Sequence, residues 1–152
     1  MSSEASTAET KYKSPLVSSV SLGPADGVLG TGGGESIVIS GNYFGTSGAA
    51  AAPVLLEYGP YNATSCSVSS QTVMECVSAV GVGNRHAARV YVDGQWSTYS
   101  GPVVEVWYRR PSVSTAEAVS GSDDIESMPT TGGTLVRLTG SDFGPVDASA
   151  LP

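Results

Sequence analysis

The stretch TGGGESIVISGNYFG (residues 31–45) occurs again in altered form as TGGTLVRLTGSDFG (residues 131–144). Phe44 aligns with Phe143, an offset of 99 residues. Each form begins with glycines, continues with a short run rich in β-branched and aliphatic residues, and ends in Phe-Gly. Glycine-flanked runs of this kind are typical of β-strands that lie between turns. The sequence therefore contains an internal repeat.

Apolar residues alternate with other residues inside both forms of the repeat. Ile37 and Ile39 share one side of the first strand, and the offset places Val136 and Leu138 at the same two positions. The outward residues are Val38 and Ser40 in the first copy, and Arg137 and Thr139 in the second. Successive side chains of a strand point to opposite faces, so the inward face stays apolar in both copies while the outward face varies. Two copies of one structural unit are expected to differ in this way.

The glycines of the repeat have a mechanical interpretation. We expect Gly32-Gly33, and Gly132-Gly133 in the second copy, to take the positive φ that reverses the chain before the strand. Gly41 and Gly45 are expected to release the first strand at its far end, so that Phe44 turns into the core. A β-branched strand follows Gly34 and no helix does, so this is not a phosphate-binding loop.

The rest of the sequence predicts an all-β fold. Short segments bounded by Gly, Pro, Asn or Ser succeed one another, and no window carries a helical period. In the segment 87–94, for example, Ala88, Val90 and Val92 are expected to face inward. Strands of this length and spacing are typical of a β-sandwich. The predicted strands are 15–22, 36–41, 53–59, 66–68, 73–80, 87–94 and 102–108.

Three regions follow from this pattern. Residues 1–13 are polar and are expected to form a disordered tail or linker. Residues 14–109 are expected to form one complete domain, and residues 110–152 the N-terminal part of a second. Because the second copy stops at Pro152, we expect the chain to be an excerpt of a longer protein, and there is no signal peptide in the polar start.

Composition excludes several classes of partner. The formal net charge is −7, from 14 acidic and 7 basic residues. So few dispersed cations cannot neutralise a nucleic acid backbone or bind an anionic membrane surface. No apolar run reaches the length that a membrane-spanning helix needs. We therefore expect no nucleic acid partner and no direct membrane insertion in this segment.

Taken in order, these motifs resemble the IPT/TIG domain, an immunoglobulin-like β-sandwich. The resemblance rests on PLVSSV…GGGESIVISGNYFG and its second form PSVSTA…GGTLVRLTGSDFG, on the cysteine segment CSVSSQTVMEC, on RVYVDG, and on the closing strand VEVWYRRP. It covers residues 15–152, as one full domain and the start of a second. The ordered set, with its restart at Pro111, is more specific than any single motif.

The resemblance implies a non-catalytic module of an extracellular or cell-surface tandem-repeat protein, such as a stalk, receptor ectodomain or surface filament. Its partners would be neighbouring IPT/TIG domains or other copies of the same chain, with a glycan as a further possibility. Two alternatives stay open. One is a carbohydrate-binding accessory domain of a secreted enzyme, with Tyr58, Tyr61, Trp96 and Tyr99 as sugar-stacking candidates. The other is an intracellular dimerisation module.

Cys66 and Cys76 are candidates for a disulfide bond. In a hairpin that turns near Gln71 the two cysteines face each other directly, which brings them within reach of a disulfide. The resemblance to extracellular members of the family favours the same pairing. Two unpaired core cysteines are the alternative. A disulfide indicates an oxidising compartment and argues against the intracellular module.

Asn62 lies in NAT, the only N-glycosylation sequon of the chain. In a secreted protein we expect this asparagine to carry a glycan, which would keep its loop out of an interface. His86, the only histidine, is expected to be a solvated loop residue. Without further ligands around it, His86 predicts no metal site.

The strand PVVEVWY and the RRP that follows it suggest an interface. Glu105 indicates that its face of the strand points outward, and Trp107 shares that face. Aromatic and arginine residues are enriched in interfaces, so Trp107, Arg109 and Arg110 are candidates for contact with the next domain or another chain. The alternative is that Trp107 folds back under a neighbouring loop.

Nothing in the sequence indicates catalysis. No histidine lies beside a nucleophile, and the carboxylates show no pairing suited to acid–base chemistry, so we expect neither an enzyme nor a cofactor. The acidic cluster Asp123, Asp124 and Glu126 has the ligand type that Ca²⁺ prefers, but its spacing matches no calcium loop. We interpret it as a solvated connection.

Overall fold

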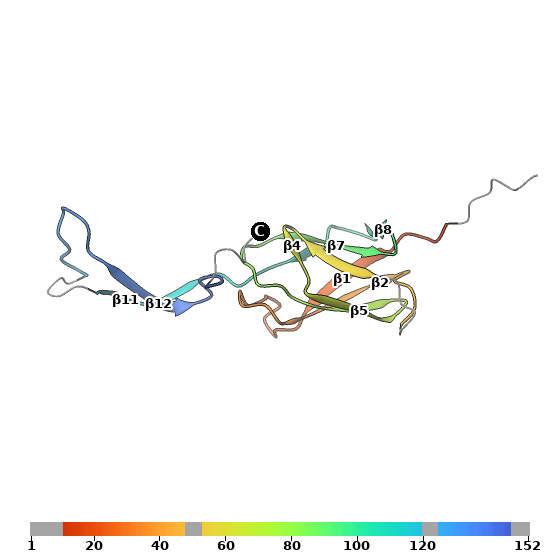
Figure 1. The fold of residues 1–152 in the computed structure, drawn as a ribbon, viewed down its shortest axis with the longest axis horizontal. Helices are drawn as coiled ribbons and strands as arrows, with labels where there is room; N and C mark the ends of the chain where they lie inside the picture. The colour runs from red at the N-terminus through yellow and green to blue at the C-terminus, as the bar shows by residue number, and fades with distance from the viewer. Residues whose placement is uncertain (1–10, 48–52, 120–124, 147–152) are drawn as a thin grey trace, which may run out of the picture.

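The computed structural model describes residues 11–47, 53–119 and 125–146, and these residues form strands, turns and loops without a helix (Figure 1). The all-β prediction is confirmed. Among the residues described, no helix is long and apolar enough to cross a lipid bilayer. The strands are β1 (Leu16–Leu22), β2 (Ser36–Asn42), β3 (Val54–Tyr58), β4 (Tyr61–Asn62), β5 (Ser65–Ser70), β6 (Val73–Val77), β7 (His86–Val92), β8 (Gln95–Trp96), β9 (Thr98–Tyr99), β10 (Glu105–Val106), β11 (Ser112–Ala118) and β12 (Val136–Ser141).

The first ten strands form two sheets over one shared core. One sheet has the order β5-β6-β2-β1-β9, and the other has the order β10-β7-β3-β4 with β8 beside β7. Ile39 and Met74 reach the core from the first sheet, and Leu56 and Val90 reach it from the second. This arrangement is consistent with a β-sandwich. We call residues 15–109 the first unit.

The predicted alternation accounts for the core. Ile37 and Ile39 on β2 are fully buried, as are the inward residues of β7, of which Val90 has no exposed surface. Burial of each such aliphatic side chain contributes about 1.5–3 kcal/mol. Phe44 is buried as predicted and closes the end of the core beyond β2. The predicted inward faces of both strands are therefore confirmed.

Gly41 is required for a reason that the sequence did not suggest. A Cβ built at Gly41 would lie 1.9 Å from the main-chain oxygen of Leu16 and 2.7 Å from the ring of Phe44. Glycine therefore lets β1 and the Phe44 ring approach β2 closely. The residue that takes a positive φ here is Tyr43, at 65°, and Gly45 follows at 92°.

The predicted glycine turn needs one correction. The positive φ angles of the first copy fall on Gly33 and Gly34, and not on Gly32. A hydrogen bond from the amide of Gly33 to the carbonyl of Gly30 sets the turn one residue later than predicted. In the second copy the positive angles fall on Gly132-Gly133, as expected.

The strands β11 and β12 form a separate antiparallel hairpin that reproduces the pair β1–β2. Both pairs contain a register shift at the same place, after Val17 in the first and after Val113 in the second. A Cβ built at Gly140 would meet the main-chain oxygen of Ser112 at 1.9 Å and the Phe143 ring at 2.8 Å. Asp142 repeats the positive φ of its counterpart, at 56°. The repeat therefore extends to backbone conformation and steric detail.

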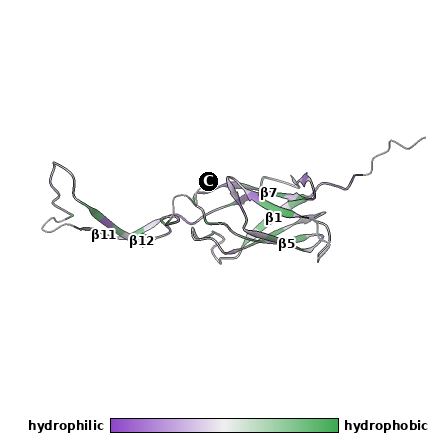
Figure 2. Cartoon of the chain, in the orientation of Figure 1, coloured by the Kyte–Doolittle hydropathy of each residue, from purple (hydrophilic) through white to green (hydrophobic). Residues whose placement is uncertain are grey.

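The two pairs differ in what covers them. Ile39 and Phe44 have 0% and 1% of their surface exposed, whereas the matching Leu138 and Phe143 have 53% and 52% exposed. Figure 2 shows hydrophobic stretches on the hairpin as well as on β1. In the first unit β6 pairs with the outer edge of β2, but within the described residues no strand pairs with that edge of β12. In the part of the chain that the structure describes, the hairpin thus has the inward face of a sandwich without an opposing sheet.

The closing strand is shorter than the predicted segment 102–108. Only Glu105 and Val106 pair with β7, and Tyr108 instead forms an isolated parallel bridge with Leu29. The chain moves from one sheet toward the 24–30 loop at this point. The predicted facing is nevertheless confirmed, since Val106 and Tyr108 are buried and Trp107 is 44% exposed.

Candidate interaction surface at the end of the first unit

Tyr108 is the last core residue of the first unit, and buried polar groups surround it. Its ring packs edge-on against Tyr61 at 5.3 Å between centroids, and lies 6.0 Å from the His86 ring. Its hydroxyl donates to the carbonyl oxygen of Ala79 at 2.8 Å and lies 2.9 Å from the hydroxyl of Tyr58. We call the residues around Tyr108 the tyrosine socket, namely Tyr58, Tyr61, Ala79, Gly81, Val82 and His86.

The hydroxyls of Tyr58 and Tyr61 in the socket are both hydrogen-bonded. The Tyr58 hydroxyl accepts from the amide of Ala79 at 2.8 Å. The Tyr61 hydroxyl donates to the carbonyl of Val82 and accepts from the amide of the same residue, both at 3.1 Å. Gly81 leaves room for the ring, since a Cβ at this position would lie 2.6 Å from Tyr108. The segment 79–82 is therefore shaped around this one side chain.

Burial and hydrogen bonding change the titration of the two buried phenols. Burial, followed by the hydrogen bond with Tyr58, raises the pKa of Tyr108 far above its ordinary value. Burial also raises the pKa of Tyr58. Both groups stay protonated, and so keep their hydrogen bonds, throughout the neutral range.

These shifts predict a loss of stability at alkaline pH. The unfolded tyrosines titrate near 10.0 while the folded ones titrate higher, so the unfolded chain releases protons first as the pH rises. The free energy of unfolding should be insensitive to these two groups below about pH 9. It should then fall as the pH rises through the ordinary pKa range of tyrosine, by at most about 1.4 kcal/mol per pH unit for each of them. Urea unfolding between pH 8 and pH 11 measures this slope. Tyr108→Phe should remove the contribution of one tyrosine, so that the free energy of unfolding falls less steeply with pH. Equal slopes in both proteins would show that Tyr108 does not cause the decline.

Arg109 ties the end of the closing strand back to the first unit. Its amide donates to the carbonyl of Leu29 at 2.6 Å, and its guanidinium forms an ion pair with Asp26 at 2.8 Å. Burial acts to raise the pKa of Asp26, but the hydrogen bonds from Arg109 and from the amide of Val28 outweigh it, so the pKa is lowered. Of the predicted interface residues, Arg109 is therefore held by its own unit, while Arg110 is exposed.

A groove lies where the first unit meets the hairpin. Its volume is about 510 Å³, and its walls come from three short segments, 82–84, 108–111 and 142–145. Gly144 approaches Val82 closely, since a Cβ built on Gly144 would lie 3.1 Å from the Cγ1 atom of that valine. Arg110 lines the groove, whereas Trp107 lines a different hollow that includes Asp26 and Val28. The structure thus separates the three predicted interface residues between two surfaces.

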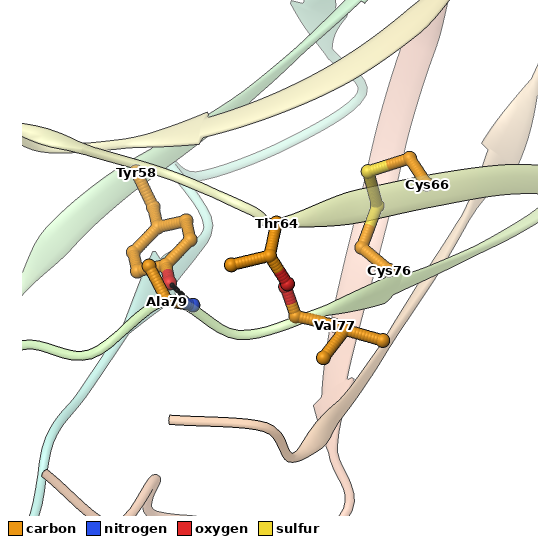
Figure 3. The surroundings of a disulfide bond; sticks show 6 residues. All are labelled: Tyr58, Thr64, Cys66, Cys76, Val77 and Ala79. Carbon is orange, nitrogen blue, oxygen red and sulfur yellow. Dashed lines mark hydrogen bonds between the residues drawn. A yellow bond between two sulfur atoms is a disulfide. The ribbon is translucent and has the colours of Figure 1, made fainter. Parts of the chain in front are cut away.

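The predicted disulfide between Cys66 and Cys76 is formed (Figure 3). The two residues are directly paired in the β5–β6 ladder, as the predicted hairpin register requires, and their Cα atoms lie 4.1 Å apart. Thr64 donates from its hydroxyl to the carbonyl of Val77, one residue beyond the bridge. The bond therefore joins the edge strand β5 to β6.

Removal of the disulfide should destabilise the first unit. We expect Cys66→Ala/Cys76→Ala to lower the free energy of unfolding by about 2–3 kcal/mol, because the unfolded chain regains the freedom of the closed loop. Urea unfolding with and without reductant measures the effect, and Ser67→Ala on the exposed side of β5 is the control. Reduced wild-type protein should match the double variant. A reduced protein as stable as the oxidised one would contradict the expectation.

Asn62 lies on β4 with its side chain exposed, between buried Tyr61 and Ala63. The sequon is therefore accessible on the folded surface. Glu57 is its partner across the strand pair.

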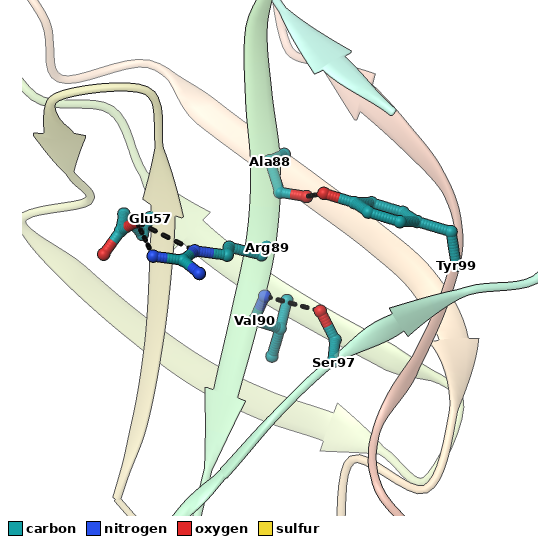
Figure 4. Close-up of polar contacts among 6 residues, drawn as sticks. All are labelled: Glu57, Ala88, Arg89, Val90, Ser97 and Tyr99. Carbon is teal, nitrogen blue, oxygen red and sulfur yellow. Dashed lines mark hydrogen bonds and ion pairs between the residues drawn. The ribbon is translucent and has the colours of Figure 1, made fainter. Parts of the chain in front are cut away.

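Two predictions about side chains were wrong. His86 is not a solvated loop residue, because it begins β7, packs edge-on against Tyr61 and donates from Nε2 to the carbonyl of Val82 at 3.0 Å. Tyr58 and Tyr61 are buried and cannot stack on a sugar. Tyr99 is half-buried and donates its hydroxyl to the carbonyl of Ala88 at 2.6 Å (Figure 4).

Trp96, the fourth sugar-stacking candidate, is partly exposed but already has neighbours. The Arg89 guanidinium lies 4.3 Å from the centre of its ring, and Tyr91 packs edge-on at 5.2 Å. Glu57 holds the same guanidinium at 2.6 Å, a contact drawn in Figure 4. One face of the indole is therefore covered by a cation that is itself ion-paired.

No protein-family model, curated protein or solved structure matches this chain. Within the described residues, no three His, Cys, Asp or Glu side chains converge as metal ligands would. Two residues of the predicted acidic cluster, Asp123 and Asp124, lie outside the described residues, as do residues 1–10 of the predicted tail.

The tyrosine socket is the feature that the sequence analysis missed. Its members come from β3, β4, the 78–84 loop and β7, and 50 positions separate Tyr58 from Tyr108, the residue that fills the socket. The local sequence around the socket, GVGNRH at 81–86, is polar and rich in glycine, and it favoured a solvated loop instead.

Proposed function

We propose that the chain is a non-catalytic structural or adhesion module, built from immunoglobulin-like units of the IPT/TIG type that follow one another end to end. The observation that carries the proposal is the hairpin. It repeats the register shift, the positive φ angles and the glycine contacts of β1–β2, and it leaves Leu138 and Phe143 uncovered. A hairpin of two strands is at best marginally stable in water by itself. It therefore needs an opposing sheet like the one that covers β1–β2.

The geometry of the first unit suits a connecting role. Residues 11–15 leave one end of the unit and residues 110–112 leave the opposite end (Figure 1). Only Arg110 and Pro111 separate the ion-paired Arg109 from the start of β11, and proline restricts the chain further. Such a connection allows little change of angle between successive units. The proposed role is that of a spacer or binding element in a stalk, receptor ectodomain or surface filament.

The proposed location is the extracellular space or the cell surface. The Cys66–Cys76 disulfide supports an oxidising environment. If the protein is secreted from a eukaryotic cell, the exposed Asn62 should carry a glycan. A mass shift on deglycosylation that Asn62→Gln abolishes is the expected result, with Asn84→Gln as the control. A secreted protein of unmodified mass would contradict this part of the proposal.

The end-to-end arrangement is tested with a two-unit chain, in which residues 1–145 are followed directly by residues 47–109. This chain supplies the hairpin with the covering strands of the first unit. Small-angle X-ray scattering should give a maximum dimension close to twice that of residues 11–109 alone. A compact side-by-side particle would contradict the proposal.

Trp107 provides a separate test of association. Because this side chain is 44% exposed, Trp107→Ala should weaken unit–unit or chain–chain association more than it destabilises the first unit. Sedimentation of the two-unit chain and urea unfolding of residues 11–109 measure the two effects. Equal losses in both would exclude Trp107 as an interface residue.

The alternative of a carbohydrate-binding domain is tested on a glycan array, on which we expect no binding.

A further inference from the structure

The repeat extends to the residues that precede the first unit. The sequence Tyr-Lys-Ser-Pro at 12–15 aligns with Tyr-Arg-Arg-Pro at 108–111, an offset of 96 residues. Each tyrosine is followed by a basic residue, and each proline leads two positions later to a valine near the start of a strand, Val17 or Val113. Val17 is buried, whereas Val113 is 56% exposed. Tyr12 therefore occupies the position that Tyr108 holds at the end of the first unit.

The surroundings of these two tyrosines are opposite. Tyr108 is 2% exposed and fills the tyrosine socket of the first unit. Tyr12 is 88% exposed. Large apolar or aromatic side chains exposed in a group on an otherwise polar surface indicate an interaction site, and Tyr43, at 47% exposed, lies in the same groove as Tyr12. Within the described residues, Tyr12 therefore lacks the burial that Tyr108 has, while its neighbour Lys13 places its Nζ atom 5.1 Å from the centre of the Tyr43 ring.

A groove at this end corresponds to the junction groove. It has a volume of about 570 Å³, and the segments 12–15 and 43–46 contribute to its walls. These are the counterparts of 108–111 and 142–145 at the other end. In the junction groove the third wall is the loop 82–84 of the preceding unit. Here Gln71, Val92, Asp93 and Gln95 of the first unit line the remainder.

We infer that this end of the first unit, formed by residues 12–15 and 43–46, is the docking surface for the end of another unit of the same type. The proposal rests on the proposed end-to-end function and names the residues that would serve it. Tyr12 inserts into the tyrosine socket of that other unit, as the closing residue of its last strand. The loop equivalent to 82–84 of that unit forms a further wall of the groove, opposite Tyr43 and Gly45.

The chemistry of the partner follows from the occupied junction. It needs a backbone carbonyl equivalent to that of Ala79, and a buried hydroxyl equivalent to that of Tyr58, to receive the Tyr12 hydroxyl. It needs a small residue at the position of Gly81, because a Cβ there collides with the tyrosine ring. A carboxylate at the position of Asp26 would pair with Lys13, which stands where Arg109 stands in the junction. The socket of this chain is filled by Tyr108, so the partner is a further unit whose own socket is vacant.

The test is an extended chain, in which a second copy of residues 15–107 is placed directly before Tyr12 of residues 12–152. In this chain the added copy has no closing tyrosine except Tyr12. A reference chain carries residues 15–110 directly before residues 15–152 and so keeps the natural closing sequence. Scanning calorimetry follows the two units, and Tyr12→Ala is made both in the extended chain and in the natural one.

In the extended chain both units should unfold within a few degrees of the reference. Tyr12→Ala should move the part of the unfolding enthalpy that belongs to the added copy to a temperature lower by at least about 10 °C, as expected for loss of a buried aromatic ring. In the natural chain the same substitution should shift the transition by less than about 2 °C.

Three results would overturn the inference. The first is that Tyr12→Ala leaves the unfolding temperature of the added copy unchanged, and the second is that the added copy folds only in the reference chain. In either case Tyr12 does not fill a socket, while the proposed end-to-end function still stands. If the reference chain also fails to form two folded units, the proposed end-to-end function fails together with the inference.

Discussion

Gly41→Ala is expected to unfold or severely destabilise the first unit. The added methyl carbon would lie 1.9 Å from the main-chain oxygen of Leu16, which cannot move unless β1 separates from β2. It would also displace the buried ring of Phe44. Forced overpacking of this kind costs about 3 kcal/mol or more when the colliding atom belongs to the backbone. Thermal unfolding followed by circular dichroism should show a melting temperature lower by at least about 12 °C.

The chain contains a matched control for this substitution. Gly140 has the same contacts in the hairpin, where a Cβ would meet Ser112 and Phe143 at almost the same distances. Gly140→Ala should disturb only the hairpin and leave the melting temperature of the first unit within about 2 °C of wild type. If both substitutions lower that temperature equally, the first unit and the hairpin do not behave as separate copies.

Tyr108→Ala is the second substitution with a large expected effect. It empties the tyrosine socket and leaves the carbonyl of Ala79 and the hydroxyl of Tyr58 without their buried partner. Loss of a buried aromatic side chain costs about 3–5 kcal/mol. Urea unfolding of the full chain measures this loss. Tyr108→Phe, which keeps the ring and removes the hydroxyl, should cost about 1–2 kcal/mol and so separates packing from hydrogen bonding.

Trp107→Ala is the control for Tyr108→Ala on the same strand. Trp107 points outward and is 44% exposed, so its removal should cost the first unit no more than a third of the loss caused by Tyr108→Ala. The same two substitutions distinguish a residue that closes the core from one that is available for contact. If Trp107→Ala lowered the free energy of unfolding more than Tyr108→Ala does, Trp107 and not Tyr108 would be the residue that closes the core.

The sequence was informative where the signals are local. The alternation around Ile37 and Ile39 follows directly from the two-residue period of a strand, and the glycines mark its ends. The register of Cys66 and Cys76 followed from the symmetry of a hairpin about its turn. The internal repeat was visible because the same local requirements act twice, and the steric role of Gly140 matches that of Gly41.

The features that the sequence did not predict depend on contacts between distant segments. Tyr58, Tyr61 and Tyr108 lie far apart in the sequence, and nothing local indicates that they meet near the carbonyl of Ala79. His86 lies among polar and glycine residues, which predicted a loop, yet tertiary packing places it against Tyr61. The shortened closing strand has the same cause, because Tyr108 leaves its sheet to reach this socket.

The central claim is that β11 and β12 are the first strand pair of a second unit and need an opposing sheet. Amide hydrogen exchange of residues 112–118 and 136–141 tests it most directly, measured in the natural chain and in the two-unit chain. In the natural chain these amides should exchange within seconds to minutes, because an uncovered hairpin is marginally stable. In the two-unit chain they should be protected at least 100-fold more strongly, to about the level of β1 and β2 in the same molecule. Equal protection of the hairpin in both chains would contradict the account.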